Sequence, residues 1–210
     1  MSADVALNEE LKRANTLTEA RNRELEAAKE RIEFTALHDA LTGLPNRRYL
    51  DGVLAEHAEL FEAGRETAGL LHIDLDRFKQ INDTLGHSAG DYVLVATAQR
   101  MRETCRASDL CVRLGGDEFA ILLAGDKVEE RALQFCERIC AMLDTPFEIE
   151  SNSIRLSASI GMAVYPLYAA SASELLQNAD MAMYTRKRTG KNGSQVFDSS
   201  IMDRAREHAE

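Results

Sequence analysis

The segment Gly115-Gly116-Asp117-Glu118-Phe119 separates two short apolar stretches, residues 110–114 and 119–123. Paired glycines permit the sharp reversal that a tight hairpin requires, and they let a bulky ligand approach the backbone closely. The segment therefore predicts a β-hairpin whose tip carries two carboxylates, Asp117 and Glu118. Taken alone, such a tip has a simple alternative interpretation, an acidic turn that faces solvent.

A second acidic segment favours a binding site over a solvated turn. The apolar run 68–73 predicts a central strand, and it ends at Asp74-Leu75-Asp76. If this strand lies beside the hairpin, the neighbouring backbones are about 4.8 Å apart, and Asp74 and Asp117 converge on one cation. Clustered carboxylates repel one another, and a hard divalent metal ion relieves that repulsion. We expect Mg²⁺, because it combines a few carboxylates with the phosphate oxygens of a substrate.

The predicted elements around the hairpin alternate between strands and helices. Further strands are predicted at 68–74, 154–165 and near Val196. Helices are predicted from the turn at Gly43-Leu44-Pro45 to about Ala63, and at 76–84, 88–105, 127–143 and 172–188. This order predicts the α/β class, an α+β sandwich in which helices flank a mixed sheet.

The N-terminal segment has a different pattern. Residues 5 to about 37 contain no glycine or proline and predict one long helix, whose apolar positions recur in the heptad steps of a coiled coil. The seam runs through Leu7, Leu11, Ala14, Thr18, Arg21, Leu25, Ala28, Ile32 and Thr35. We expect residues 1–37 to form a parallel coiled-coil dimer; a solvated linker helix or a helix packed on its own domain are the alternatives. The rest divides into a globular domain, 38–200, and a tail, 201–210.

The composition narrows the classes of function. The 210 residues are 45% hydrophobic and 29% charged, as in a globular protein. The formal net charge of −10 argues against a nonspecific nucleic-acid-binding protein, which needs a basic face. No apolar run approaches the roughly 20 residues that cross a bilayer, and the N-terminus lacks the layout of a signal peptide. We expect a cytoplasmic protein, bound to neither nucleic acid nor membrane, whose four cysteines are reduced, buried thiols.

Six segments together resemble the GGDEF family of diguanylate cyclases over about residues 36–198. They are Asp39-x-Leu-Thr-Gly-Leu-Pro-Asn-Arg-Arg48, Asp74-x-Asp-x-Phe-Lys-x-Ile-Asn82-Asp83, Gly86-His-x-x-Gly90-Asp91, Arg113-x-Gly-Gly-Asp-Glu-Phe119, Ser159-Ile-Gly161, and Ala179-Asp180 through Tyr184 to Lys187. The resemblance implies a fold like the palm of nucleotidyl cyclases and polymerases. It also implies that Asp39 and Arg48 join the first helix to the domain in a structural role.

The same resemblance implies an acidic centre that binds Mg²⁺ or Mn²⁺. Asp74 and Asp117 bind the metal, with help from the backbone carbonyl of Leu75. Glu118 belongs to the same centre, and with Asp117 it is expected to be catalytic; whether Glu118 deprotonates the attacking hydroxyl is left open. For Asp76 a structural and a catalytic role remain equal alternatives.

Substrate-binding residues are implied as well. Asn82 and Asp91 correspond to the pair that recognises guanine, although Asp91 also fits a capping box that opens at Ser88. The triphosphate is expected near a set of basic and backbone groups: Phe78, Lys79, Gly115, Gly116, Lys187 and Lys191. Position 191 more often carries arginine, and Arg186 stands where a small residue is usual. The chain has no P-loop motif.

The function implied is condensation of two GTP molecules into cyclic di-GMP and pyrophosphate. Each domain holds one GTP, so the resemblance implies a homodimer, joined through the N-terminal helix and linked to an upstream sensory domain. Arg106 and Asp109 are expected to form an inhibitory site for the product, with a helix-end ion pair as the simpler interpretation. The alternative function is a non-catalytic module that binds GTP or cyclic di-GMP.

Overall fold

A computed structural model of the chain describes residues 2–59, 67–149, 152–198, 200 and 201. The predicted end of the second helix, 60–63, and the predicted tail from 202 onward lie outside these residues. So do the side chains of Leu7, Leu11 and Ala14. The chain forms two compact units, Met1–His38 and Asp39–Glu210, and each is described by itself.

The first unit is one helix, α1 (Ser2–Leu37), as the absence of glycine and proline predicts. Leu25 and Ile32 of the predicted seam are 73% and 69% exposed. Apolar side chains this exposed on a single helix have no core of their own to join. In the described part of the chain, no helix is both long and apolar enough to span a lipid bilayer.

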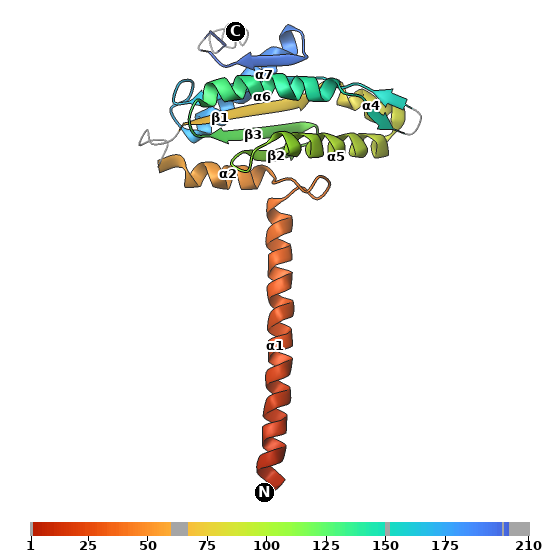
Figure 1. The fold of residues 1–210 in the computed structure, drawn as a ribbon, viewed down its shortest axis with the longest axis vertical. Helices are drawn as coiled ribbons and strands as arrows, with labels where there is room; N and C mark the ends of the chain where they lie inside the picture. Colours follow the sequence, from red (N-terminus) through yellow and green to blue (C-terminus); the bar gives the residue numbers. More distant parts are fainter. Residues whose placement is uncertain (1, 60–66, 150–151, 199, 202–210) are drawn as a thin grey trace, which may run out of the picture. The chain divides into compact units, whose positions relative to one another are not determined.

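The second unit is built on a mixed five-stranded sheet with the order β2-β3-β1-β6-β7. Figure 1 shows three of these strands, β1, β3 and β2, in that sequence. Its strands are β1 (Ala68–Leu75), β2 (Leu110–Gly115), β3 (Glu118–Ala124), β6 (Ala158–Tyr165) and β7 (Gly193–Val196). Only the β6–β7 pair among these is parallel. β1 lies at the centre, which agrees with its fully apolar start, and the predicted mixed sheet flanked by helices is confirmed.

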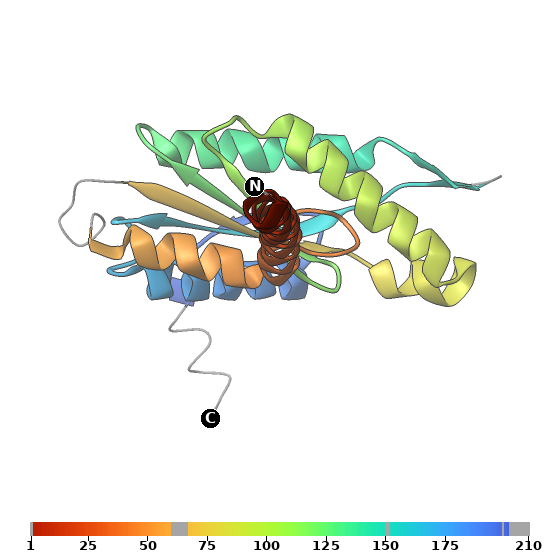
Figure 2. The same ribbon diagram turned by 90° about the horizontal axis from the view of Figure 1, so that it is seen from below.

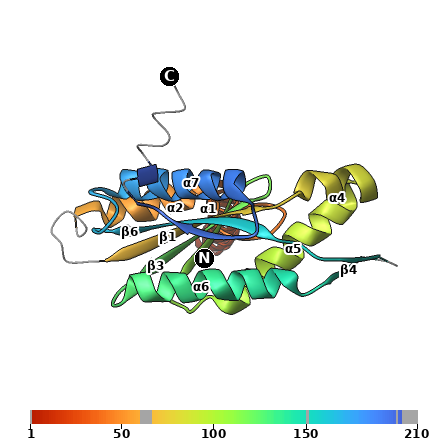
Figure 3. The same ribbon diagram turned by 90° about the horizontal axis from the view of Figure 1, so that it is seen from above.

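Helices cover both faces of this sheet (Figures 2 and 3). α5 (His87–Thr104) and α6 (Val128–Asp144) pack on one face, while α2 (Arg47–Glu56) and α7 (Ala172–Thr189) pack on the other. α4 (Phe78–Leu85) lies beside α5 at one end of the sheet. Two apolar cores, one on each side, hold the layers together.

The alternation of side chains along β1 decides what faces each helix layer. Leu71 and Ile73 belong to the core beneath α5 and α6, whereas Leu70 belongs to the core beneath α7. His72 and Asp74 share the parity of Leu70 and therefore face α7. Both are buried, at 4% and 5% exposure. Two polar side chains inside an otherwise apolar strand therefore point to a site between β1 and α7.

The structure corrects one predicted strand. The segment predicted as a single strand, 154–165, is interrupted: β5 (Asn152–Ile154) pairs with β4 (Phe147–Ile149) in a separate two-stranded sheet, and β6 starts only at Ala158. The intervening residues cross from this small hairpin to the main sheet. Because β4 and β5 have three residues each, neither is long enough to show an alternating pattern in the sequence.

Candidate active site

The two acidic segments meet at one end of the central strands. In the antiparallel pairing of β1 with β3, Asp74 lies directly opposite Glu118. The backbone N–H of Leu75 donates to the carbonyl oxygen of Asp117 over 3.2 Å. Side chains directly opposite on antiparallel strands have Cβ atoms about 5 Å apart. The strand that carries Asp74 is therefore tied to the turn that carries Asp117 and Glu118.

Asp74 forms an ion pair inside this site. Lys187, in the last turn of α7, places its Nζ 2.5 Å from Asp74 Oδ2. Burial raises the pKa of Asp74, and the hydrogen bond from Lys187 opposes this rise. The negative charges of Asp117 and Glu118 add to the increase, so the pKa of Asp74 lies above its usual range. The negative charges of these three carboxyl groups repel one another, and a bound cation would reduce that repulsion.

The donor set suits a metal that shares its coordination with a substrate. Among the residues that the structure describes, no three His, Cys, Asp or Glu side chains gather into a complete metal cage. Mg²⁺ does not need one, because it is commonly held by one or two carboxylates together with phosphate oxygens and water. Asp74 with Asp117 or Glu118 supplies two carboxylates, so the residues fit a Mg²⁺ or Mn²⁺ ion bound with a polyphosphate.

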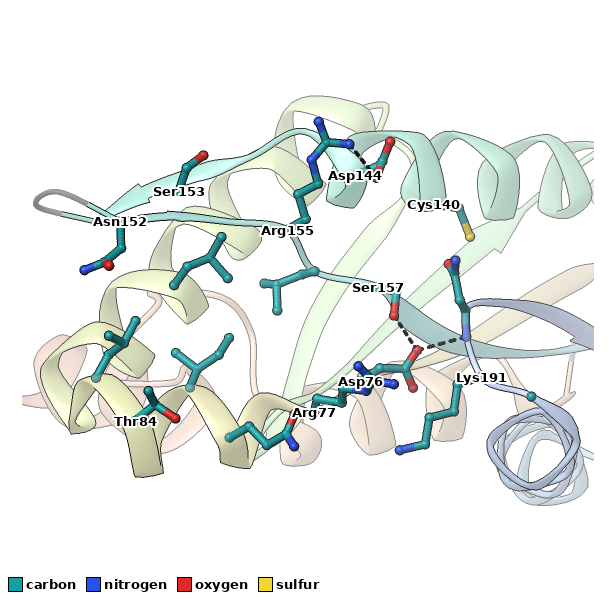
Figure 4. A pocket seen from close by; sticks show the side chains of 17 residues that line it. Asp76, Arg77, Thr84, Cys140, Asp144, Asn152, Ser153, Arg155, Ser157 and Lys191 are labelled. Atoms are coloured by element: carbon teal, nitrogen blue, oxygen red, sulfur yellow. Dashed lines mark hydrogen bonds and ion pairs between the residues drawn. The ribbon is translucent and has the colours of Figure 1, made fainter.

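Asp76 has a structural role in this arrangement. Its carboxylate accepts hydrogen bonds from the hydroxyl of Ser157 over 2.8 Å and from the backbone N–H of Asn192 over 2.9 Å (Figure 4). It also accepts from the hydroxyl of Ser159 over 2.8 Å. With 5% exposure and three donors, Asp76 is satisfied by the protein. It ties the segment after α7 to the end of β1.

The proposed guanine-recognising pair lies on neighbouring helices. Asn82 of α4 packs directly on Gly90 of α5, where an added Cβ would lie 2.0 Å from Asn82 Oδ1. Asp91, the next residue, is exposed. The capping-box interpretation of Asp91 is wrong: α5 starts at His87 with Gly86 as its N-cap, and no side chain caps it. Asp91 thus lies beyond the first turn of α5, where its carboxylate is not needed by backbone N–H groups.

The groups predicted to bind a triphosphate include residues at the start of α4 and at the end of α7. Phe78 and Lys79 are the first two residues of α4, whose N-terminus has no side-chain cap. Free N–H groups at a helix N-terminus are suited to bind phosphate. Lys191 follows α7 and lines a cavity of about 890 Å³ together with Asp76 and Arg77 (Figure 4). The structure thus places Lys187 and Lys191 at the C-terminal end of α7, near Asp74 and Asp76 respectively.

Arg113 holds the acidic turn, residues 115–118, in place through hydrogen bonds. Its Nε and Nη2 donate to the carbonyl oxygen of Gly116 over 3.2 and 2.7 Å, and its Nη1 donates to Asp39 Oδ1 over 2.8 Å. Asp39 also accepts from the backbone and hydroxyl of Thr42. Burial raises the pKa of Asp39, but these hydrogen bonds from Thr42 and Arg113 outweigh it, and the pKa falls below its usual range.

The predicted inhibitory pair lies at the opposite end of β2. Arg106 is exposed, but the side chain of Asp109 is only 1% exposed and is paired with Arg131 of α6 over 2.7 Å. Asp109 also accepts from the backbone N–H of Arg106 over 2.9 Å. A strand of six residues places this pair roughly 20 Å from the acidic turn. Arg131 was not predicted, because nothing in the sequence connects α6 with the start of β2.

His72 and Asp180 are further neighbours of the acidic centre. His72 Nδ1 lies 3.1 Å from Asp180 Oδ1 on α7, and His72 Nε2 lies 3.8 Å from Glu118 Oε2. This contact with His72 lowers the pKa of Asp180. Sequence reasoning did not select His72 as a site residue. The two-residue spacing from Asp74 was the available signal, since residues two apart on a strand share a face.

The comparisons with known proteins agree with this geometry. The family model "Diguanylate cyclase, GGDEF domain" matches residues 36–193. The chain is 44% identical over 168 residues to the diguanylate cyclase TpbB of Pseudomonas aeruginosa, which covers 80% of this chain and 39% of TpbB. The chain therefore spans about two fifths of that relative's length.

Two solved structures are similar in fold. A truncated TpbB (YfiN) of Pseudomonas aeruginosa that comprises only the GGDEF domain has a TM-score of 0.76 at 42% identity, over 82% of this chain and 99% of that chain. The coiled coil and GGDEF domain of DgcB from Caulobacter crescentus, in complex with c-di-GMP, has a TM-score of 0.80 at 27% identity, over 89% of this chain and 98% of that chain.

Proposed function

The chain belongs to the GGDEF domain family, and on that basis we propose that it is a diguanylate cyclase, which condenses two GTP molecules into cyclic di-GMP and pyrophosphate. The observation that carries the proposal is the placement of Asp74 opposite Glu118, beside Asp117 and within reach of Lys187. Carboxylates and a lysine concentrated at one strand end suit the transfer of a nucleotidyl group, where charge neutralisation and positioning do most of the catalysis.

We propose that one GTP binds to each domain. Asn82 and Asp91 read the guanine, because an amide both donates and accepts while a carboxylate accepts from N1–H and N2–H₂. The phosphates lie against the first N–H groups of α4, the backbone of Gly115 and Gly116, and the amines of Lys187 and Lys191. Lys187 leaves Asp74 for a phosphate oxygen, which frees that carboxylate.

A divalent ion completes the site in this proposal. Asp74, the carbonyl of Leu75, Asp117 and Glu118 would hold Mg²⁺ or Mn²⁺, and the ion would supply positive charge that polarises the phosphate under attack. The 3′-hydroxyl of one GTP attacks the α-phosphate of the other, and pyrophosphate leaves. A second, reciprocal attack releases the second pyrophosphate and closes the ring. Glu118, at the rim of the turn and half exposed, is placed to accept the proton of that hydroxyl.

The test is a product analysis. Purified protein incubated with GTP and MgCl₂ is expected to form cyclic di-GMP and pyrophosphate, identified by liquid chromatography and mass spectrometry, whereas Asp117→Asn forms neither. If the wild-type protein binds GTP or cyclic di-GMP but forms no dinucleotide, the chain is instead a non-catalytic receptor. With ATP added at the same concentration as GTP, formation of mixed guanine–adenine rings would contradict the proposed assignment of Asp91.

Two chains must meet for this reaction, because one domain holds one reactant. We propose that α1 brings them together as a coiled coil, which covers the exposed Leu25 and Ile32. A 39–210 fragment is expected to lose at least about tenfold in specific activity at submicromolar concentration, since tethering raises the effective concentration of the second domain. Activity per chain should recover as the fragment is concentrated. Equal activity of both proteins at every concentration would contradict a role for α1.

We also propose that the product inhibits the enzyme at Arg106 and Asp109. Arg106 is exposed and available, while product contact with Asp109 competes with Arg131. Arg106→Ala is expected to raise the half-inhibitory concentration of cyclic di-GMP by about tenfold or more, because a charge-assisted hydrogen bond is lost. Progress curves measure this, with Arg102→Ala, another exposed arginine, as the control. Wild-type curves that stay linear as product accumulates would exclude the inhibitory site.

A further inference from the structure

The segment that follows α7 has an unusual backbone. Residues 190–193 all have positive φ angles: 149° for Gly190, 60° for Lys191, 44° for Asn192 and 139° for Gly193. Glycine adopts such angles freely, but a residue with a Cβ rarely does. The conformation of Lys191 and Asn192 therefore depends on contacts made from outside the segment.

Arg186 supplies two of these contacts. From the last turn of α7, its Nη2 donates to the carbonyl oxygen of Lys191 over 2.6 Å and to that of Asn192 over 2.7 Å. The backbone N–H of Lys191 donates in turn to the carbonyl oxygen of Arg186 over 3.1 Å. A single guanidinium thus bridges the two residues whose φ angles are least favourable.

Two neighbouring residues support this arrangement: Gly193 leaves room for the Arg186 side chain, and Asn192 attaches segment 190–193 to Asp76 at the end of β1. At Gly193, an added Cβ would lie 3.0 Å from Arg186 Nη2, so any larger residue there would press on the guanidinium. The N–H of Asn192 donates to Asp76, two residues beyond Asp74 on the same stretch of chain. The position of Lys191 relative to the acidic centre is therefore set by Arg186 on one side and Asp76 on the other.

We infer that Arg186 is a positioning residue for GTP: it holds residues 190–193 so that Lys191 is presented to the triphosphate before the nucleotide arrives. The inference rests on the proposed function, because it takes Lys191 to contact a phosphate. A lysine binds phosphate as a single point charge without the fork of an arginine, so its contribution depends on being held in place. Preorganisation of this kind increases affinity by removing the ordering cost from the binding step.

The inference also explains two departures of the sequence from the family's pattern. The resemblance to the GGDEF family places Arg186 at a position where a small residue is expected, and Lys191 at a position where arginine is expected. In the structure these two positions are joined by a hydrogen bond. Arg186, in the last turn of α7, thus supports the segment that carries Lys191.

The principal experiment compares Arg186→Ala with the wild-type protein. The KM for GTP is expected to rise about tenfold while kcat stays within about twofold, because binding and not the chemical step is affected. The Kd of a non-reacting GTP analogue with an α,β-methylene bridge, measured by calorimetry with Mg²⁺, should rise by a similar factor. Arg186→Lys, which retains a donor, should lie between the two proteins.

Two further variants separate positioning from a general effect on charge or folding. Arg188→Ala removes the same charge from an exposed site on the same helix turn, and it should change the KM by less than about twofold. In a Lys191→Ala background, Arg186→Ala should cause no further rise in KM, since the residue through which it acts is gone.

The inference is overturned if Arg186→Ala leaves the KM and the Kd of the analogue unchanged, if Arg188→Ala has an equal effect, or if the effect persists in full without Lys191. Each of these results contradicts the inference alone. The proposed function still holds if the wild-type protein makes cyclic di-GMP. If the wild-type protein neither binds the analogue nor converts GTP, the proposed function fails and the inference fails with it.

Discussion

Replacing Asp74 with asparagine is expected to lower the rate of cyclic di-GMP formation by at least about a hundredfold, because the charge that attracts the divalent ion is lost. The substitution preserves the size of the side chain and one oxygen that Lys187 contacts. The register with Glu118 is formed by the backbone of β1 and β3 and stays intact. Initial rates of pyrophosphate release measure the effect.

The same variant is not expected to be less stable when metal is absent. The pKa of Asp74 is raised in the folded protein, so this carboxyl contributes stability below its unfolded pKa and loses that contribution as pH rises through the folded value. The charged form of Asp74 is therefore less favourable in the folded chain than in the unfolded one. Removing the charge should leave the midpoint of thermal unfolding unchanged or raise it when EDTA is present, as expected of a site shaped for a ligand.

A matched control is Asp126→Asn, which removes one carboxylate from an exposed turn. It should retain both full activity and the wild-type unfolding midpoint. If Asp74→Asn kept more than about a tenth of the wild-type rate, the acidic centre would not be the site of the charge stabilisation that metal-assisted transfer requires.

Arg113→Ala is expected to lower the free energy of unfolding by about 2 kcal/mol, the cost of removing a charged hydrogen-bond donor from a partly buried ion pair. Arg113 is 9% exposed, and it joins Asp39 at the start of the domain to Gly116 in the acidic turn. Its loss leaves the carbonyl oxygen of Gly116 without two donors. Urea unfolding followed by circular dichroism measures the change.

The effect of Arg113→Ala should depend on pH in a defined direction. The folded pKa of Asp39 lies below its usual value, so its stabilising contribution is present above the unfolded pKa of about 3.9 and is lost as pH falls through the folded value. The difference between wild type and variant should therefore be largest near neutral pH and shrink in acid.

Asp39→Asn provides the control for this second prediction. If the two residues act as a pair, the double variant should be less destabilised than the sum of the single variants, by about 1 kcal/mol or more. Ordinary surface substitutions change the free energy of unfolding by no more than about 0.5 kcal/mol. If Arg113→Ala stays within that range, the contact between Arg113 and Asp39 does not stabilise the fold.

Short-range patterns predicted most of the fold. The paired glycines at 115 and 116 predicted the hairpin, and the apolar run before Asp74 predicted the central strand; both are observed. The small β4–β5 hairpin was missed because three residues are too few for a pattern. The capping box at Ser88 was wrong because Gly86, with φ of 85°, starts α5 earlier.

The partners of charged side chains were much harder to predict. The sequence left Asp76 open between two roles, and the three donors that it meets in the folded chain favour the structural one. The neighbour of Asp109 is Arg131, 22 residues away, and that of Arg113 is Asp39, 74 residues away. No local pattern marks either pair.

The sequence by itself therefore predicted the residues that we propose to carry the chemistry, the order of the main strands and helices, and the family to which the chain belongs. Only the tertiary structure decided that Lys187 neutralises Asp74, that Arg131 covers Asp109 and that Arg186 holds the Lys191 segment. The reason is physical: strand alternation and turn geometry depend on a few consecutive residues, whereas the partner of a buried charge depends on which distant elements pack against it.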